Sequence, residues 1–204
     1  SLWIKDFMRD SKYKKNVFVF GSTNNKNYLT KNYININFPS INSKFYSTTK
    51  EYSKRIIIKL KKSHYDIIEL HNRPIMVSDF IKKINSKIIL YFHNDPRTMK
   101  GAKTVSDRIN LINSVDKIIF ISNWVKRKFF EGLSNLSENK TQVIYHSIDP
   151  VTKITKKNKQ IIFVGKLNES KGYDLFCKAL FPILDKHTDW KAISIGDEKR
   201  FQHY

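Results

Sequence analysis

The chain has 204 residues, of which 38 are Lys or Arg and 18 are Asp or Glu, so its formal net charge is +20. Apolar residues make up 40% and aromatic residues 13%, which is enough for a packed core and argues against a disordered chain. No apolar run approaches the roughly 18 residues of a membrane-spanning helix, and no signal peptide opens the sequence, so we expect a cytoplasmic protein. Cys177 is the one cysteine, which excludes an internal disulfide, and we expect it to be buried in a helix.

The basic charge allows two interpretations. Only seven of the 38 basic residues are Arg, and Lys, Asn and Ile, the residues that an AT-rich genome encodes most, are all abundant. The charge therefore reflects either codon bias or selection for an anionic partner. In the second case the chain could be a non-catalytic basic module that binds nucleic acid or another polyanion. However, the sequence lacks the clusters of Arg and aromatic side chains that are typical of proteins that bind nucleic acids sequence-specifically. We therefore expect no nucleic acid as a partner.

In chain order, short β-branched or aromatic runs alternate with longer segments of helical period, which is typical of a parallel sheet covered by helices. The sequence opens with an amphipathic segment, "LWIKDFMRDSKY", that predicts a helix. A later helix starts at Pro74, whose missing N–H costs nothing in a first turn, and another has Ser122 as its predicted N-cap. We predict strands at 16–20, 66–70, 87–92, 117–121 and 142–145, with 33–38 as a further candidate, and helices at 48–64, 74–84, 103–115 and 122–133.

The polar, lysine-rich stretch "PVTKITKKNK" predicts a domain boundary near residue 151. Residues 1–151 then form one domain, in which 16–145 make one parallel sheet flanked by helices. Residues 152–204 begin a second domain, with strands at 160–164 and 191–195 and a helix from Tyr173 that Pro182 should kink. Two strands and one helix are too few to close a core of their own.

Several common cofactor and metal motifs are missing from the sequence. There is no G-x-G-x-x-G, no G-x-x-x-x-G-K-[ST], no Cys and His set with zinc spacing and no G-x-S-x-G. A dinucleotide oxidoreductase and a P-loop enzyme are therefore disfavoured, and no metal site is expected.

Polar residues follow three predicted strands at their carboxyl ends, where ligands bind in open α/β sheets. Each residue alone is most simply explained as part of a polar loop, and a lone His as a structural hydrogen-bonding group. Three polar groups in succession along one edge favour a ligand site. They are His71, Asn72 and Arg73 in "ELHNRP", His93, Asn94 and Asp95 in "YFHNDP", and Ser122 and Asn123 in "ISNW".

A second candidate site lies in "IIFVGKLNESKGYDLF", residues 161–176. Gly165 lets the chain turn off a buried strand close to a ligand, and Gly172 leads into a helix whose first free N–H groups favour an anion. Lys166 and Lys171 beside them suit a diphosphate. In a chain so rich in lysine, two surface side chains without a ligand explain the pattern equally well.

"VGKLNESKG" closely resembles the element that opens the second domain of the family 4, or group 1, glycosyltransferases of GT-B architecture. "DIIELHNRP" and "KIILYFHNDP" resemble two central strands of that family's first domain, "DKIIFISNWVKRKF" the strand and helix that follow, and "QVIYHSIDP" the junction between the domains. The resemblance runs from about residue 16 to residue 198. The occurrence of these motifs in the family's order is far more specific than any one motif.

The resemblance implies an α/β fold of GT-B type, in which a Rossmann-like acceptor-side domain precedes the first βαβ of a Rossmann-like nucleotide-sugar domain. It implies a retaining glycosyltransferase, of hexosyltransferase type, that uses a UDP- or GDP-linked sugar donor and neither cofactor nor metal. The implied acceptor is a bacterial cell-surface glycan or glycolipid, such as lipopolysaccharide or capsule. Peripheral contact with anionic membrane, at the inner face of the cell membrane, is implied as well.

The resemblance also implies roles for residues at matching positions. His93 is expected near the reacting sugar. The donor diphosphate would face Gly165, Lys166, Lys171 and Gly172. The acceptor side would include His71, Arg73, Asn94 and Ser122.

Some features depart from the family pattern. Lys166 stands where the family usually has Arg, and His146 and Ser147 replace an Asn-Gly pair at the domain junction. The family's first strand and its glycine-rich loop would belong before Ser1, and the E-x₇-E element that holds the donor sugar and ribose is missing. We therefore expect an internal fragment of an enzyme, inactive alone.

Overall fold

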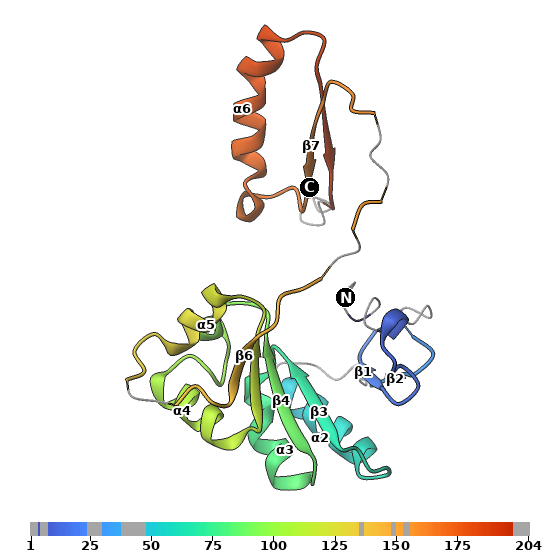
Figure 1. Cartoon of the computed structure of the whole chain (residues 1–204), viewed down its shortest axis with the longest axis vertical. Helices are drawn as coiled ribbons and strands as arrows, with labels where there is room; N and C mark the ends of the chain where they lie inside the picture. Colours follow the sequence, from blue (N-terminus) through green and yellow to red (C-terminus); the bar gives the residue numbers. More distant parts are fainter. Residues whose placement is uncertain are drawn as a thin grey trace. The chain divides into compact units, whose positions relative to one another are not determined.

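The structure is a computed structural model that describes residues 4, 8–23, 30–37, 48–134, 137–147, 150–152 and 156–197. The chain divides into two compact units, Ser1–Ile148 and Asp149–Tyr204, coloured from blue to amber and from orange to red in Figure 1. Each strand pair within the described residues is parallel. The predicted fold class, α/β with parallel sheets, is therefore confirmed.

A four-stranded parallel sheet forms the centre of the first unit (Figure 1). The spatial order of its strands, β3-β4-β5-β6, is also their order in the chain. Alternate residues of β4 are buried, which places Ile88, Leu90 and Phe92 in the core. The strands are β3 (Ile67–His71), β4 (Lys87–Phe92), β5 (Lys117–Phe120) and β6 (Thr141–Val143).

Helical segments connect these strands, and several of them start at a side chain that caps the helix. Thr104 and Asp107 form a capping box at the start of α4, and Ser122 caps α5 as predicted. The segment predicted as one helix from Pro74 starts as a short 3₁₀ turn and continues as an α-helix. The segments are α2 (Thr48–Leu60), η1 (Pro74–Met76), α3 (Val77–Lys83), η2 (Pro96–Thr98), α4 (Val105–Ser114) and α5 (Asn123–Phe130). No helix in the described part of the chain is long and apolar enough to cross a membrane.

Aromatic side chains fill the middle of this unit's core. Phe92 from β4, Phe120 from β5 and Phe129 from α5 are fully buried, with ring centroids 5.3 to 5.9 Å apart. Other apolar side chains of the sheet and of α2 to α5 belong to the same core. This packing holds the carboxyl ends of the strands, where the candidate site lies, on a rigid base.

The prediction of one sheet through residues 16–145 was wrong. Strands β1 (Val19–Gly21) and β2 (Tyr33–Asn35) pair in parallel with each other as a separate two-stranded sheet. Within the described residues, this pair shares no hydrogen-bond ladder with the four-stranded sheet. It contacts the core through side chains, because Phe20 and Ile34 pack against the core cluster. Tyr52 of α2 also donates a hydrogen bond to the Phe20 carbonyl. Of the predicted opening helix, residues 4 and 8–10 are helical, whereas residues 2, 3 and 5–7 lie outside the described residues.

The second unit is a parallel βαβ, as its hydrophobic pattern predicted. It contains β7 (Gln160–Val164), the 3₁₀ turn η3 (Glu169–Lys171), α6 (Tyr173–Lys186) and β8 (Lys191–Ile195). The ring of Phe163 on β7 packs at 5.1 Å from the rings of Tyr173 and Phe176 on α6, so α6 covers one face of the strand pair.

None of the described side chains in this unit is buried. The other face of the strand pair leaves apolar side chains uncovered by the unit's own elements: Ile162, Val164, Ile193 and Ile195. The expectation that Cys177 is buried was also wrong, because its thiol is exposed. Two strands are too narrow to cover more than one stripe of α6, and Cys177 lies outside that stripe.

Candidate functional site

Three histidines lie in a row at the carboxyl edge of the four-stranded sheet. His71 ends β3, His93 follows β4, and His146 follows β6. Nδ1 of His71 is 2.9 Å from Nε2 of His93, and Nδ1 of His93 is 3.2 Å from Nε2 of His146. The rings of His93 and His146 are stacked with 14° between their planes, and those of His71 and His93 are tilted by 31°. We call these three residues the histidine row.

Glu69 and Tyr91 hold the end of the row at His71. The carboxylate of Glu69 lies 3.4 Å from Nε2 of His71 and also accepts a hydrogen bond of 3.4 Å from the Tyr91 hydroxyl. The Tyr91 ring stacks on the His71 ring with centroids 4.5 Å apart. Burial, together with the charge of Glu69, raises the pKa of Tyr91 to about 12. The Tyr91 hydroxyl therefore stays protonated and continues to donate to Glu69.

Asn72 ties the loops after β3 and β4 together. Its backbone is left-handed, with φ of 52°, a conformation that Asn tolerates better than most residues. Its side-chain oxygen accepts a hydrogen bond of 2.7 Å from the His93 amide, and its side-chain nitrogen donates one of 2.8 Å to Asn94. Asn72 thus fixes the backbone that carries His93.

The environment of His93 favours a neutral ring. Burial lowers the pKa of His93 to about 4, and the neighbouring rings of His71 and His146 add to this effect. Near neutral pH the His93 ring is therefore uncharged.

The structure brings together some of the residues that the sequence pointed to, but not all of them. His71, Asn72, His93 and Asn94 form one hydrogen-bonded cluster. Ser122 uses its hydroxyl to accept from the Val125 amide as the cap of α5. Arg73 is exposed and donates to the Asn72 carbonyl beside it in the chain.

His146 is the member of the row that sequence reasoning missed. It was noted only as a departure from the family's domain junction, although it follows a predicted strand as His71 and His93 do. Its strand, β6, is separated from β4 by β5, yet the contact of 3.2 Å shows that its ring reaches His93. The sequence feature that could have identified His146 is that a histidine follows each of three strands of one sheet.

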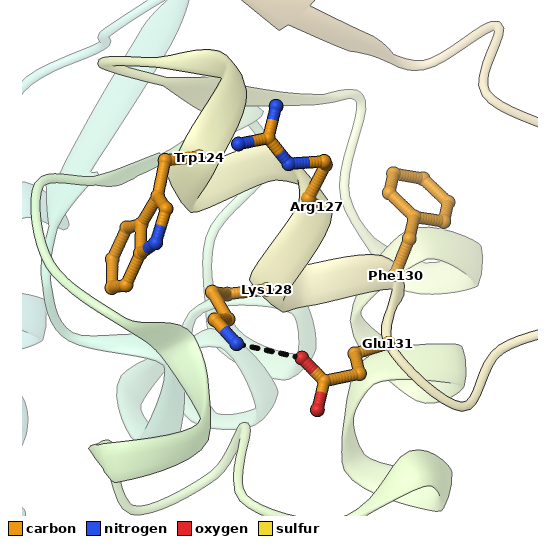
Figure 2. Close-up of a pocket in the computed structure, with 5 residues that line it drawn as sticks. All are labelled: Trp124, Arg127, Lys128, Phe130 and Glu131. Carbon is orange, nitrogen blue, oxygen red and sulfur yellow. Dashed lines mark hydrogen bonds and ion pairs between the residues drawn. The ribbon is translucent and has the colours of Figure 1, made fainter.

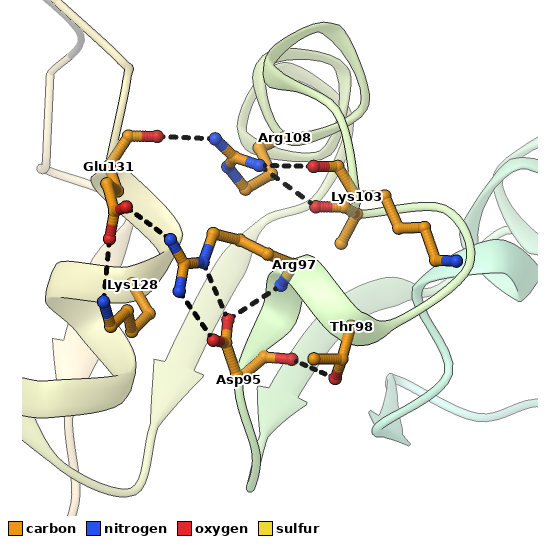
Figure 3. A network of polar contacts seen from close by, with 8 residues as sticks. Asp95, Arg97, Thr98, Lys103, Arg108, Lys128 and Glu131 are labelled. Carbon is orange, nitrogen blue, oxygen red and sulfur yellow. Dashed lines mark hydrogen bonds and ion pairs between the residues drawn. The ribbon is translucent and has the colours of Figure 1, made fainter.

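Asp95 belongs to a structural network rather than to the row (Figure 3). It caps η2 by accepting from the Arg97 amide, and its two oxygens also bind the Arg97 guanidinium at 3.1 and 2.9 Å. Hydrogen bonding to Arg97 lowers the pKa of Asp95. Arg97 also pairs with Glu131, which accepts from Lys128 at 3.0 Å. Buried Arg108 completes the network by donating to the carbonyls of Ala102, Lys103 and Glu131.

A shallow hollow lies along α5, lined by Trp124, Arg127, Lys128, Phe130 and Glu131 (Figure 2). Figure 2 shows the Lys128 ammonium turned toward the Glu131 carboxylate, its partner in an ion pair. Two of the charged groups lining the hollow thus already neutralise each other. The histidine row, held from several elements, is the stronger candidate site of this unit.

The second unit places its two lysines close to the start of α6. An ideal Cβ on Gly165, at the end of β7, would lie 3.9 Å from Cβ of Lys171, so the two loop ends are adjacent. Gly172 takes a left-handed φ of 71° and caps α6 without a side chain. Lys166 and Lys171 are exposed, and neither forms an ion pair within the described residues. A Cβ on Gly196 would lie 1.8 Å from the Gly165 carbonyl oxygen, so the loop after β8 closes tightly on this turn.

Comparisons with known proteins found relatives of part of the chain, one of which is named as a glycosyltransferase. No family model matches the chain. The chain is 30% identical over 172 residues to a Bacillus subtilis protein named "Putative glycosyltransferase YtcC", covering 72% of this chain and 40% of that protein. It is 24% identical over 167 residues to spore coat protein SA of the same organism, covering 72% of this chain and 44% of that protein. The chain thus spans less than half the length of these relatives.

Among solved structures, the chain is similar to one in the crystal structure of accessory secretory protein 1, 2 and 3 in Streptococcus pneumoniae. The TM-score is 0.47 at 11% identity, and the match covers 74% of this chain and 37% of that chain.

Proposed function

We propose that the chain is part of a retaining glycosyltransferase of GT-B architecture that transfers a sugar from a nucleotide-diphosphate donor. The observation that carries this proposal is the 30% identity to a protein named as a glycosyltransferase, over 72% of the chain. The ordered series of motifs, which resembles the family 4 enzymes, supports it. In this proposal residues 1–151 form the acceptor side, and residues 152–204 begin the domain that binds the nucleotide sugar.

The donor diphosphate would bind where β7 meets α6. Cleavage of the bond between sugar and diphosphate leaves negative charge on the departing phosphate. Lys166, Lys171 and the first N–H groups of α6, which no side chain caps, are suited to stabilise that charge without a metal. Gly165 and Gly172 let the backbone approach the phosphates closely.

The sugar acceptor would bind at the carboxyl edge of the four-stranded sheet. His93 is the proposed residue nearest to the reacting sugar, because it lies in the middle of the histidine row. His71 and Asn94 support it through hydrogen bonds, directly and through Asn72. Arg73 and Ser122, the other two residues proposed for this side, lie on the loops that follow β3 and β5.

The acceptor and the place of action are proposed from the family resemblance. The acceptor would be a bacterial cell-surface glycan or glycolipid, such as lipopolysaccharide or capsule. Transfer would take place in the cytoplasm, with the basic surface resting on anionic lipid at the inner face of the membrane.

Nucleotide binding by this chain tests the donor site. We expect UDP or GDP to bind in isothermal titration calorimetry, and Lys171→Ala to weaken binding roughly tenfold or more because it removes a cation from the diphosphate. Lys178→Ala is the matched control, since Lys178 is an exposed lysine on α6 itself. Lys166→Arg should bind as the native chain does. Equal binding by Lys171→Ala and Lys178→Ala would contradict the assignment.

The net charge of +20 supports a second candidate function, a non-catalytic basic module that binds a polyanion. Such binding is driven by counterion release and weakens steeply with salt. A salt titration against duplex DNA, run beside the nucleotide titration, distinguishes the two. Tight, salt-sensitive DNA binding without UDP or GDP binding would favour the basic module.

A further inference from the structure

The hollow along α5 combines an exposed aromatic ring with an exposed guanidinium. Trp124 is 47% exposed, and the Lys128 ammonium lies 5.9 Å from the centroid of its ring, which holds the ring from one side. Glu131 pairs with both Lys128 and Arg97, so its charge is already compensated. Arg127 has no hydrogen-bond or ion-pair partner in the part of the chain that the structure describes. Figure 2 shows its guanidinium apart from the Lys128–Glu131 pair, where an anionic ligand can reach it.

This hollow adjoins the carboxyl edge of the four-stranded sheet. The side chain of Asn123, the first residue of α5, donates a hydrogen bond of 2.9 Å to the hydroxyl of Tyr145, which is exposed. Trp124 follows Asn123 in the chain, and Tyr145 directly precedes His146 of the histidine row. The hollow therefore begins beside the edge at which the sugar acceptor is proposed to bind.

We propose that this hollow binds an acidic sugar of the acceptor glycan, with the sugar ring stacked on Trp124 and its carboxylate held by Arg127. The inference rests on the proposed glycosyl transfer, because that proposal makes the first unit the acceptor side, and it adds the chemical class of the acceptor. It concerns binding and specificity, and no covalent bond forms or breaks in the hollow.

The lining of the hollow matches both parts of such a ligand. The C–H groups on one face of a sugar ring carry a slight positive charge and pack on the electron-rich face of an indole. A guanidinium donates two parallel N–H groups to a carboxylate. The volume of the hollow, about 510 Å³, lies within the range of roughly 300 to 1,000 Å³ that small-molecule sites have. A neutral sugar would stack on Trp124 without using Arg127, so the lining favours an acidic one.

An anionic membrane surface fits this helix less well than a sugar does. A helix that lies on a membrane buries an apolar face in the lipid. On α5 the apolar side chains of Val125 and Phe129 are buried in the protein core, and Phe130 is half-buried. Trp124 is the exposed apolar side chain of α5, and it borders a hollow, whereas a bilayer surface is flat on this scale. One exposed ring beside a hollow suits a small ring-shaped ligand.

Two methyl glycosides that differ at one carbon test the proposal on the whole chain. Methyl β-D-glucuronide has a carboxylate where methyl β-D-glucoside has a hydroxymethyl group. In NMR titrations of the nitrogen-15-labelled chain, we expect the glucuronide to shift the indole N–H signal of Trp124, one of three tryptophans, which a Trp124→Phe variant assigns. It should bind roughly fivefold or more tightly than the glucoside. No shift of the Trp124 signal, or equal binding of the two sugars, would overturn the proposal.

Arg127→Gln tests the contact with the carboxylate. It removes the charge and keeps a polar side chain, so we expect the glucuronide to bind this variant as weakly as the glucoside does. Lys126→Gln is the matched control, because it removes the same charge from the same helix, while Lys126 pairs with Glu138 and does not line the hollow. Equal losses in the two variants would assign the preference to the general charge of the chain and overturn the contact.

Nucleotide and lipid binding separate this proposal from its neighbours. Binding of UDP or GDP tests the proposed donor site in the second unit. Nucleotide binding without glucuronide binding would overturn the acidic-sugar site and leave the proposed glycosyl transfer in place, whereas the reverse result would support the site and count against the transfer. Cosedimentation with phosphatidylglycerol vesicles tests the membrane. Vesicle binding that Trp124→Ala and Arg127→Gln both abolish, in a chain that binds no glucuronide, would make the hollow a lipid contact.

Discussion

Asn72 combines a strained backbone with hydrogen bonds that position His93, and the two contributions can be separated by substitution. Asn72→Ala loses both side-chain hydrogen bonds and keeps a left-handed φ, so we expect it to lower the free energy of unfolding by about 2 kcal/mol. Asn72→Gly loses the same bonds without the backbone strain and should cost about 1 kcal/mol less. Urea unfolding of both variants measures the difference, and equal costs would show that the strain contributes nothing.

The depressed pKa of His93 predicts how stability depends on pH. The pKa is about 4 in the folded chain against an ordinary value of 6.5, so between these values the unfolded chain binds a proton that the folded chain does not. Stability is therefore complete above pH 6.5 and falls as the pH is lowered toward 4. Because the ring is only half-buried, we expect a loss of ~1 kcal/mol over this range.

Urea unfolding at several pH values checks this prediction with two variants. His93→Gln should remove this part of the pH dependence. His64→Gln should retain it, because the His64 side chain is 78% exposed. A pH dependence of native size in His93→Gln would assign the effect to other groups.

At the scale of elements, the tight contact between the loops after β7 and β8 should be the most sensitive point of the second unit. A Cβ on Gly196 would lie 1.8 Å from the backbone oxygen of Gly165, and this backbone atom cannot move aside without displacing β7. We expect Gly196→Ala to lower the midpoint of unfolding of this unit and to abolish nucleotide binding.

Gly172→Ala gives the matched comparison for this prediction. Its Cβ would meet no atom within 4 Å, so the change costs only the backbone strain of a left-handed alanine, about 1 kcal/mol. Circular dichroism with thermal melting should rank Gly196→Ala as the more damaging of the two. The opposite order would mean that the contact between the loops relaxes easily.

The sequence predicted most strands well, because short runs of β-branched and aromatic residues leave a clear pattern. The ranges 87–92, 160–164 and 191–195 match the observed strands residue for residue. The separate pairing of β1 with β2 could not be predicted, since strand partners depend on tertiary packing and not on the pattern of one strand. The exposure of Cys177 was missed as well. The helical period of a segment does not show how many strands cover the helix.

The candidate site was predictable in part. His71, His93 and Asn94 follow from the rule that ligand groups gather at the carboxyl ends of parallel strands. Ser122 matched that rule too, but its hydroxyl caps α5, a use that competes with ligand binding at the same position. The position of the His146 ring beside His93 depends on the path of the chain after β6, past β5. No local sequence pattern predicts this path.

At the scale of the whole molecule, the second unit leaves one face of its strand pair uncovered by its own elements. Val164 is 74% exposed and Ile162 is 52% exposed on this face. Exposed apolar strand surface favours association between chains, so we expect this chain to self-associate at high concentration. Ile162→Lys should reduce the association without unfolding the unit. Sedimentation velocity at a series of concentrations measures it.

Ile161→Lys is the matched control, one residue away on the opposite face of the strand. Ile161 is half-buried on the side that faces α6, and a charge there should unfold the unit. A chain that is monomeric at every concentration would contradict the role of the uncovered face. Equal effects of the two substitutions would contradict the assignment of faces.

The long reach of His146 has a kinetic consequence. The His93–His146 contact joins residues that are 53 positions apart, and it requires β4, β5 and β6 to be in place. Contacts of large sequence separation tend to form late, after shorter loops have closed. The stacking of these two rings should therefore be among the last events as the first unit folds, and a probe at His146 would report the arrival of the native state.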